Sequence, residues 1–121
     1  MIIELPELPP PLSACFINVF PRGRAISPRY KAWKKLIHVT LASRLNRDRD
    51  GEVVSFSNPV QVEYHFRRPD NKRRQDLGNL EKATSDILVS LGVIEDDSLI
   101  HDLRMRWGSD AAVTIKIESM T

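Results

Sequence analysis

The chain has 121 residues, of which 41% are hydrophobic and 28% are charged, and its formal net charge is +2. This length allows one domain over residues 1–121 with a modest core, and the composition excludes an intrinsically disordered chain. Cys15 is the only cysteine, which excludes an intrachain disulfide and a cysteine-based zinc cluster and fits a reducing cytoplasm.

The first part of the chain predicts one short strand and a long loop. Residues 2–5 suit an edge strand, and the prolines that follow, beginning at Pro6, favour a loop that continues through residues 20–24. The apolar run 12–19 is interrupted by Ser13 and Asn18 and is too short to span a membrane. We therefore expect no membrane segment, and the N-terminus has no signal-peptide pattern.

The middle of the chain predicts a helix and a strand. Ser27 suits an N-cap and Pro28 the first helical position, and apolar residues then recur at helical spacing, so we expect a helix over residues 28–45. Apolar residues alternate with polar ones from Val60 to Phe66, which predicts a strand with one buried face.

The last part predicts a second helix and two strands. The helix covers residues 77–91, and Gly92 suits its C-terminal cap. Residues 99–107 and 111–118 alternate again and read as a hairpin joined at 108–110. The order of elements predicts an α/β domain with a mixed sheet of about four strands covered by two helices.

The second helix also carries polar residues on more than one side. An apolar stripe is expected to face the sheet, whereas Gly78, Lys82 and Ser85 lie on a different face. A basic cluster precedes Asp76 at the helix start, and Asp96 and Asp97 follow the helix end. Carboxylates beside cations are what metal-dependent cleavage of a phosphodiester requires, because the carboxylates bind the metal ion and the cations bind the backbone.

Each of these residues also has an ordinary structural interpretation. Asp76 taken alone is more often a helix N-cap, and Lys82 taken alone pairs with Asp86 one turn later. Asp96 and Asp97 alone would be a polar turn. The joint order and spacing of these residues favours a functional site. Two basic segments flank an acidic centre and suit a polyanion, although the first segment alone, between Glu7 and Asp48, is more often a solvated basic helix face.

The same stretch resembles the RusA family of Holliday-junction resolvases, whose pattern is D-x-D-N-x-x-K followed by a helix and an acidic pair. Asp76, Asn79, Lys82 and the pair Asp96–Asp97 match it, and Gly78 stands where the pattern has its second Asp. The segment around Arg22 and Arg24 is similar to the family's N-terminal region in a weaker way. The resemblance implies a RusA-like fold and a homodimer that cuts branched DNA in recombination and repair, in the cytoplasm of a bacterial or phage-infected cell.

We accordingly assign expected roles to the matching residues. Asp76 and Asp97, with Asp96 as a further candidate, would bind Mg²⁺, with Mn²⁺ as the alternative metal. Lys82 would approach the scissile phosphate, and the resemblance implies that Asn79 orients the site. The expected contacts to the DNA backbone come from five basic residues, which are Lys72, Arg73, Arg74, Arg22 and Arg24.

Two other interpretations stay open on the sequence. Gly78 indicates either a ligand that has been lost, leaving a junction-binding protein with weak or no catalysis, or a position for which a water or a nearby carboxylate, Asp86 or Asp96, compensates. The other interpretation is an unrelated basic interaction domain, in which Asp76 only caps a helix.

Overall fold

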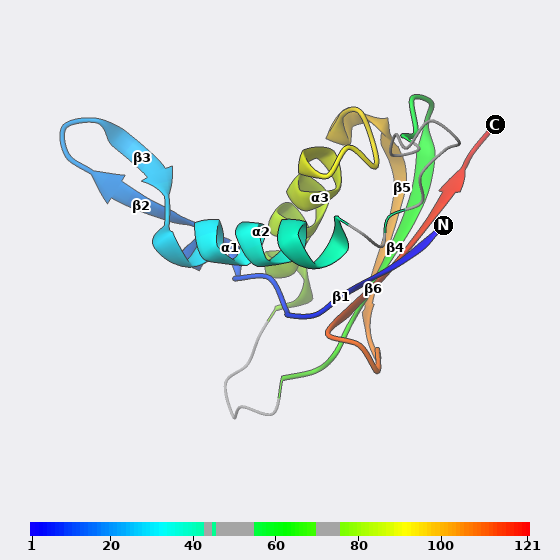
Figure 1. The fold of residues 1–121 in the computed structure, drawn as a ribbon, viewed down its shortest axis with the longest axis horizontal. Coiled ribbons are helices and arrows are strands. Elements are labelled where there is room, and N and C mark those ends of the chain that lie inside the picture. Colours follow the sequence, from blue (N-terminus) through cyan, green and yellow to red (C-terminus); the bar gives the residue numbers. More distant parts are fainter. Residues whose placement is uncertain (43–44, 46–54, 70–75) are drawn as a thin grey trace.

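The computed structural model describes residues 1–42, 45, 55–69 and 76–121. A four-stranded mixed sheet has the strand order β1-β6-β4-β5, and Figure 1 shows the helices α2 and α3 on one side of it. The strands of this sheet are β1 (Ile2–Leu5), β4 (Val60–Phe66), β5 (Ile100–Trp107) and β6 (Val113–Ser119). β4 pairs with β5 in parallel, whereas β1–β6 and β4–β6 are antiparallel. The predicted fold class is therefore confirmed.

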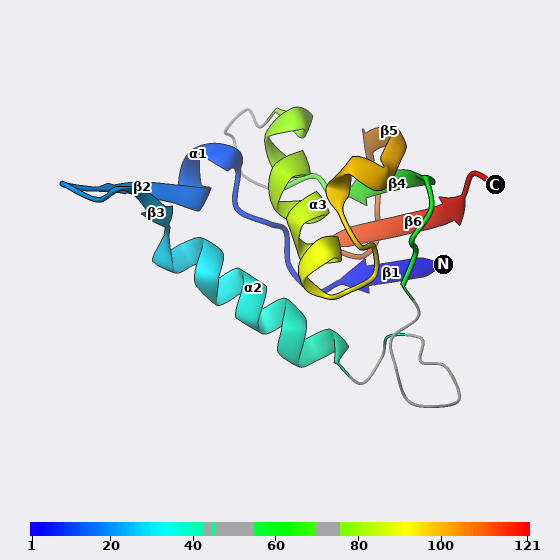
Figure 2. The same cartoon turned by 90° about the horizontal axis from the view of Figure 1, so that it is seen from above.

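The remaining elements are short except for two helices. They are α1 (Leu12–Cys15), the hairpin strands β2 (Phe16–Val19) and β3 (Gly23–Ile26), α2 (Pro28–Leu41), the 3-10 turn η1 (Leu77–Leu80), α3 (Glu81–Ser90) and the 3-10 turn η2 (Asp97–Leu99). Seen from above, α3 lies between α2 and the sheet (Figure 2). Within the described ranges, no helix combines the length and apolar character that crossing a membrane requires.

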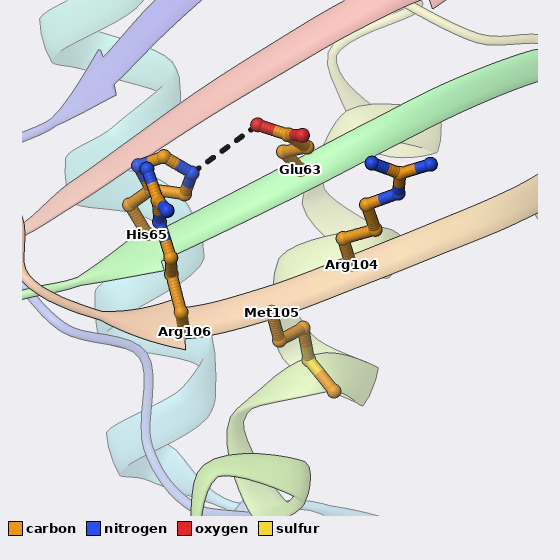
Figure 3. Close-up of a pocket in the computed structure, with 5 residues that line it drawn as sticks. All are labelled: Glu63, His65, Arg104, Met105 and Arg106. Carbon is orange, nitrogen blue, oxygen red and sulfur yellow. Dashed lines mark hydrogen bonds and ion pairs between the residues drawn. The ribbon is translucent and has the colours of Figure 1, made fainter.

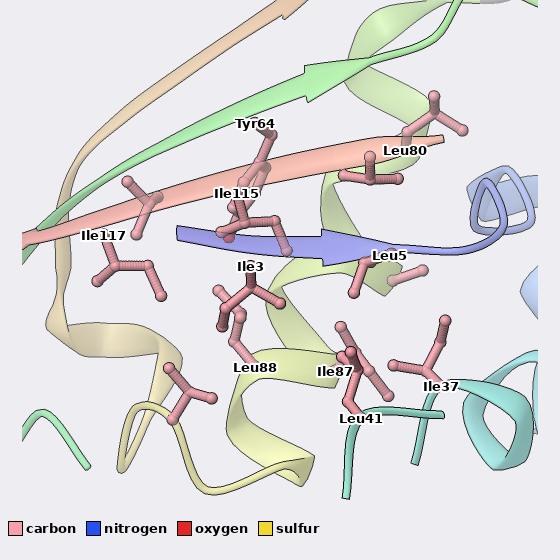
Figure 4. Close-up of a cluster of buried hydrophobic side chains, with 14 of the residues drawn as sticks. Ile3, Leu5, Ile37, Leu41, Tyr64, Leu80, Ile87, Leu88, Ile115 and Ile117 are labelled. Atoms are coloured by element: carbon pink, nitrogen blue, oxygen red, sulfur yellow. The ribbon is translucent and has the colours of Figure 1, made fainter. Parts of the chain in front are cut away.

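The core lies between the sheet and the two long helices. Ile3 and Leu5 of β1 meet Ile37 and Leu41 of α2 and the buried stripe of α3 (Figure 4). β4 contributes the central layer, because its side chains facing the helices are fully buried; these are Val60, Val62, Tyr64 and Phe66. This burial fixes the position and rotation of α3, the helix that carries the candidate site.

Several local predictions agree with the structure. β4 has the predicted bounds, and β1 is the predicted edge strand, since among the described strands it pairs with β6 alone. The hydroxyl of Ser27 accepts a hydrogen bond of 3.1 Å from the backbone N–H of Tyr30, as expected for an N-cap. Gly92 has a φ of 77°, which is the left-handed conformation expected at a helix C-cap.

The predicted hairpin of the last two strands is wrong. β4 lies between β5 and β6, so these two strands are not neighbours. The connection passes the end of β4, where Gly108 donates a backbone hydrogen bond of 2.9 Å to Phe66 and Arg67 donates one of 2.9 Å to Ala112. β4 and β6 are the two inner strands of the sheet, and the side chains of β4 that face the helices are fully buried there, which removes their apolar surface from water.

The predicted loop between residues 6 and 24 is also wrong in part. It contains α1 and the hairpin β2–β3, in which Phe16 pairs with Ile26 and Val19 with Gly23. Gly23 has a φ of 87°, a conformation that favours glycine and lets the chain reverse tightly. Both figures of the whole molecule show this hairpin extending away from the sheet and the long helices.

The helices are shorter than predicted. α2 ends at Leu41 rather than at residue 45, and the helical path of residues 77–91 begins as the 3-10 turn η1 before α3 starts at Glu81. The backbone N–H of Asn79 accordingly bonds to the carbonyl of Asp76, three residues earlier, at 3.1 Å.

Candidate active site

The flank of α3 presents a charged pair that is tied to α2. Nζ of Lys82 lies 3.2 Å from Oδ1 of Asp86, one turn later on the same helix. Oδ2 of Asp86 accepts a hydrogen bond of 3.0 Å from the hydroxyl of Tyr30 on α2. Tyr30 is itself buried in the core, so Asp86 is anchored from a second helix. The anchored carboxylate restricts where the Lys82 ammonium can lie.

The charges around Lys82 keep it protonated. The hydrogen bond to Asp86 and the charge of that carboxylate raise the pKa of Lys82, and the charges of Asp97 and Glu81 raise it further. Asp97 comes from η2, which packs beside α3. One of the predicted metal ligands therefore lies within electrostatic reach of the predicted catalytic lysine.

A buried hydrogen-bond chain lies on the inner side of α3. The hydroxyls of Tyr64 on β4 and Ser85 on α3 are 2.8 Å apart, and the Ser85 hydroxyl donates a hydrogen bond of 2.6 Å to Oε1 of Glu81. Burial raises the pKa of Tyr64, and the nearby charges of Glu81, Asp86 and Asp97 raise it as well. The prediction that Ser85 lies on the polar face is wrong, because its hydroxyl is buried against the sheet.

Asp76 stands at the start of η1 without acting as a side-chain cap. Its backbone is extended, with φ −80° and ψ 128°, and its carboxylate makes no capping hydrogen bond. The residue is exposed. The simple N-cap interpretation of Asp76 is therefore not what the structure shows.

The two downstream carboxylates have different surroundings. Asp96 caps η2: Oδ2 accepts a hydrogen bond of 3.0 Å from the Ser98 hydroxyl, and Oδ1 one of 3.5 Å from the Ser98 backbone N–H. These bonds to Ser98 lower the pKa of Asp96. Asp97 is the first residue of η2 and is exposed. The capping by Asp96 thus fixes the turn on which Asp97 stands, and an interaction with Asp97 contributes to the lowered pKa of Asp96 as well.

Gly78 lies in η1 with open space around it. A Cβ built at this position would have no heavy atom within 4 Å, and glycine is not required by a positive φ there. Neither packing nor backbone conformation therefore explains the glycine.

The predicted site residues are only partly brought together. Lys82 and Asp97 share one electrostatic environment, whereas among the described residues no hydrogen bond or ion pair links Asp76 to either of them. Their convergence stays a prediction, as does the role of the exposed Asn79. Arg22 and Arg24 belong to the β2–β3 hairpin, and Lys72, Arg73 and Arg74 lie outside the described residues.

The described carboxylates of this region are donors of the type that binds a divalent cation, but they do not form a closed cage around one. Among residues 1–42, 45, 55–69 and 76–121 there is no group of three or more His, Cys, Asp or Glu side chains that could hold a metal ion. Asp76 and Asp97 offer exposed carboxylate oxygens, and Mg²⁺ is commonly bound through one or two carboxylates while it keeps several waters. The residues present therefore fit a hydrated ion held by few protein ligands.

A polar hollow lies on the sheet face away from the helices. Glu63 and His65 of β4 lie beside Arg104 and Arg106 of β5, and Nε2 of His65 is 3.3 Å from Oε2 of Glu63 (Figure 3). Arg104 also lies 3.5 Å from Asp102. Because acids and bases neutralise each other here, this hollow lacks the excess charge of a site for a polyanion.

Comparison with known proteins shows which family the chain matches. The family described as Endodeoxyribonuclease RusA matches residues 21–118. The crossover junction endodeoxyribonuclease RusA of Escherichia coli K12 is 31% identical over 75 residues, which cover 56% of this chain and 62% of that protein. The protein of the same name from Enterobacteria phage 82 is also 31% identical over 75 residues, with the same coverage. The chain thus spans less than two thirds of the length of these relatives.

Two residues of the site carry no signal in the sequence. Tyr30 and Tyr64 anchor Asp86 and Ser85 of α3, but no local pattern marks them. The spacing of Lys82 and Asp86 was a usable signal, and the structure contains the expected ion pair. Tyr30 is separated from Asp86 by 56 residues, so only the fold reveals that contact.

Proposed function

This chain belongs to the family of the endodeoxyribonuclease RusA, and from that membership we propose that it is a divalent-metal-dependent endonuclease that resolves four-way DNA junctions by paired nicks. The match covers most of the chain and includes the whole of α3 and both flanking turns. The resemblance noted in the sequence is therefore confirmed. The substrate and the metal requirement are proposals.

The observation that carries the proposal is the environment of Lys82. Asp86, itself anchored by Tyr30, positions the Lys82 ammonium and raises its pKa, to which the charge of Asp97 also contributes. A fixed cation beside a carboxylate can bind a non-bridging oxygen of the scissile phosphate and offset the charge that develops on the phosphate. In the same region Asp76 has a carboxylate that is not used as a cap.

Each residue of the candidate site has a separate role in the proposed reaction. Asp76 and Asp97 would hold the metal ion, which when bound lowers the pKa of a water molecule and neutralises charge on the phosphate. Lys82 binds the phosphate. Asn79, exposed on η1, orients the substrate, and Asp96 keeps the η2 turn in place through Ser98. The DNA backbone is contacted by the five basic residues Lys72, Arg73, Arg74, Arg22 and Arg24. These contacts position the substrate without reading its sequence.

Asparagine substitutions test the metal ligands. In Asp76→Asn and Asp97→Asn we expect Mg²⁺-dependent nicking of a labelled four-way junction to be abolished while junction binding is retained. Asp110→Asn is the matched control, because Asp110 is an exposed carboxylate in the β5–β6 connection, and it should cut normally. Full cleavage by either of the first two variants would remove that residue from the mechanism.

A junction-binding protein with weak or no catalysis is the second candidate, and Gly78 favours it. The position has room for the family's Asp, yet it is occupied by glycine, which has no side chain to supply a donor atom. Incubating the protein with a junction and with a matched duplex, each with and without Mg²⁺, separates the candidates. Metal-dependent paired nicks support the nuclease, selective binding without nicks supports the inactive form, and no preference for the junction contradicts both.

We also propose that the active form is a homodimer, acting in the cytoplasm of a bacterial or phage-infected cell. A two-fold axis places two identical sites on two equivalent strands of a junction, which gives a physical reason for symmetric nicks. Sedimentation of the protein at assay concentration tests this, and a monomer that makes paired nicks would contradict it.

A further inference from the structure

The β2–β3 hairpin ends in an aromatic side chain that is almost fully exposed. Strand pairing runs from Phe16–Ile26 to Val19–Gly23, so residues 20–22 form the tip. Phe20 at this tip is 97% exposed, and the hairpin extends away from the rest of the molecule in both views (Figures 1 and 2). Burial in the core therefore does not account for this phenylalanine.

The charge of the hairpin identifies its partner as a polyanion. Arg22 at the tip and Arg24 on β3 are exposed, and no acidic residue occurs in the sequence between Glu7 and Asp48. The guanidinium of Arg24 lies over the ring of Phe16, 4.8 Å from its centroid, which fixes this cation along the ribbon. Two cations that closely follow a projecting aromatic ring in the chain match phosphates next to a nucleobase.

The shape of the hairpin matches branched DNA in particular. A two-stranded ribbon is narrow enough to enter a groove of DNA, and apolar side chains at such positions insert between base steps. At the branch point of a junction, bases have lost one stacking neighbour and present an open face on which an aromatic ring can stack.

We propose that the β2–β3 hairpin is a wedge whose Phe20 ring stacks on a nucleobase at the branch point, while Arg22 and Arg24 contact the adjacent phosphates. The hairpin would then supply the preference for branched over plain duplex DNA, separately from the cutting residues on α3. This inference rests on the proposed junction substrate.

The test is a binding measurement without metal, so that no DNA is cut. The junction carries 2-aminopurine beside the branch point, and a matched duplex carries it at the same position. The proteins compared are the wild type, Phe20→Ala, Phe20→Trp, which keeps an aromatic face, and Ile17→Ala, which removes an exposed apolar side chain of the hairpin away from its tip. Because Phe20 makes so little contact with the protein, its replacement should leave the melting temperature unchanged.

We expect Phe20→Ala to bind the junction roughly ten-fold more weakly and to lose the 2-aminopurine fluorescence change, with duplex binding unchanged. Phe20→Trp and Ile17→Ala should behave like the wild type. If Phe20→Ala lost affinity equally for the junction and the duplex, or lost affinity for neither, the proposed wedge would be overturned. A shift of Phe20→Ala from dimer to monomer in sedimentation would assign the tip to a second copy of the chain instead. If the wild type itself does not prefer the junction, the proposed substrate is wrong and the wedge with it; if it does and Phe20→Ala matches it, only the wedge is wrong.

Discussion

The hydroxyl of Tyr30 donates a 3.0 Å hydrogen bond to Asp86, joining α2 to the polar flank of α3. The other oxygen of Asp86 lies 3.2 Å from the ammonium of Lys82. Burial raises the pKa of Tyr30, and its hydrogen bond to Asp86 and the charge of that carboxylate raise it further, so Tyr30 remains a donor throughout the neutral range. A helix with no residue in the predicted catalytic set thereby fixes the position of the predicted catalytic lysine.

Removing the Asp86 charge should make Lys82 titrate at lower pH. The ordinary pKa of a lysine side chain is 10.5, and Asp86 is the main cause of the raised pKa of Lys82. In Asp86→Asn, the pKa of Lys82, followed by NMR of its Cε, should fall back toward 10.5. Because the folded pKa is raised, the stabilising contribution of the pair is present below pH 10.5 and is lost as the pH rises through the folded pKa.

The control for this titration is Asp102→Asn, which removes a carboxylate paired with Arg104 on the sheet. It should leave the titration of Lys82 unchanged. A Lys82 titration that is the same in the wild type and in Asp86→Asn would contradict the assigned cause.

Loss of the Tyr30 hydroxyl should affect both stability and catalysis. Hydrogen bonds to charged groups contribute about 1.5–3 kcal/mol, and a quarter of the Asp86 side chain is exposed, so we expect Tyr30→Phe to lower the free energy of unfolding by about 1–2 kcal/mol. Lys82 would then be held by an unanchored carboxylate, and kcat for junction cleavage should fall more than KM rises. Urea denaturation and steady-state kinetics measure the two effects. A change in stability with an unchanged kcat would reduce Tyr30 to a structural role.

Gly78→Asp should strengthen metal binding without disturbing the fold. The position is open and does not need a positive φ, so the new carboxylate adds an oxygen donor at the place where the family pattern has one. We expect higher Mg²⁺ affinity in calorimetry and faster nicking. Gly78→Ala is the matched control: it should raise the free energy of unfolding by roughly 0.5–1 kcal/mol, because the unfolded chain loses freedom, and leave metal affinity unchanged. Equal metal affinities in the two variants would exclude position 78 as a ligand site.

Features marked by local chemistry were predictable from the sequence. The alternation in residues 60–66, the Ser27 cap and the positive φ of Gly92 each depend on a few adjacent residues, and each prediction is confirmed. The position of β4 between β5 and β6 was not predictable in this way. Several strand orders are compatible with the same alternation of apolar and polar residues, and the packing of the whole sheet selects one of them.

In the candidate site, too, contacts between residues close in the sequence were predictable and contacts between distant residues were not. The spacing of Lys82 and Asp86 predicts their ion pair, which is present. The contacts of Asp86 with Tyr30 and of Ser85 with Tyr64 join residues far apart in the sequence. Helical periodicity places Ser85 off the apolar stripe, but it cannot show that the serine hydroxyl is buried with Tyr64 as its hydrogen-bond partner.

The buried hydrogen bond between Tyr64 and Ser85 should contribute to the free energy of unfolding but not to the affinity for DNA. Both side chains are buried and their oxygens are 2.8 Å apart, so Ser85→Ala leaves the Tyr64 hydroxyl without this partner and should cost about 1–3 kcal/mol. Tyr64→Phe should cost less than that, because it also removes the polar atom that would otherwise be left unsatisfied. In the double variant the two losses should not add, since each change removes the same hydrogen bond. Urea denaturation of the four proteins gives the coupling energy, and junction affinity should be equal in all of them. Strictly additive losses would mean that the hydroxyls do not depend on each other, and that Ser85 instead acts through its 2.6 Å bond to Glu81.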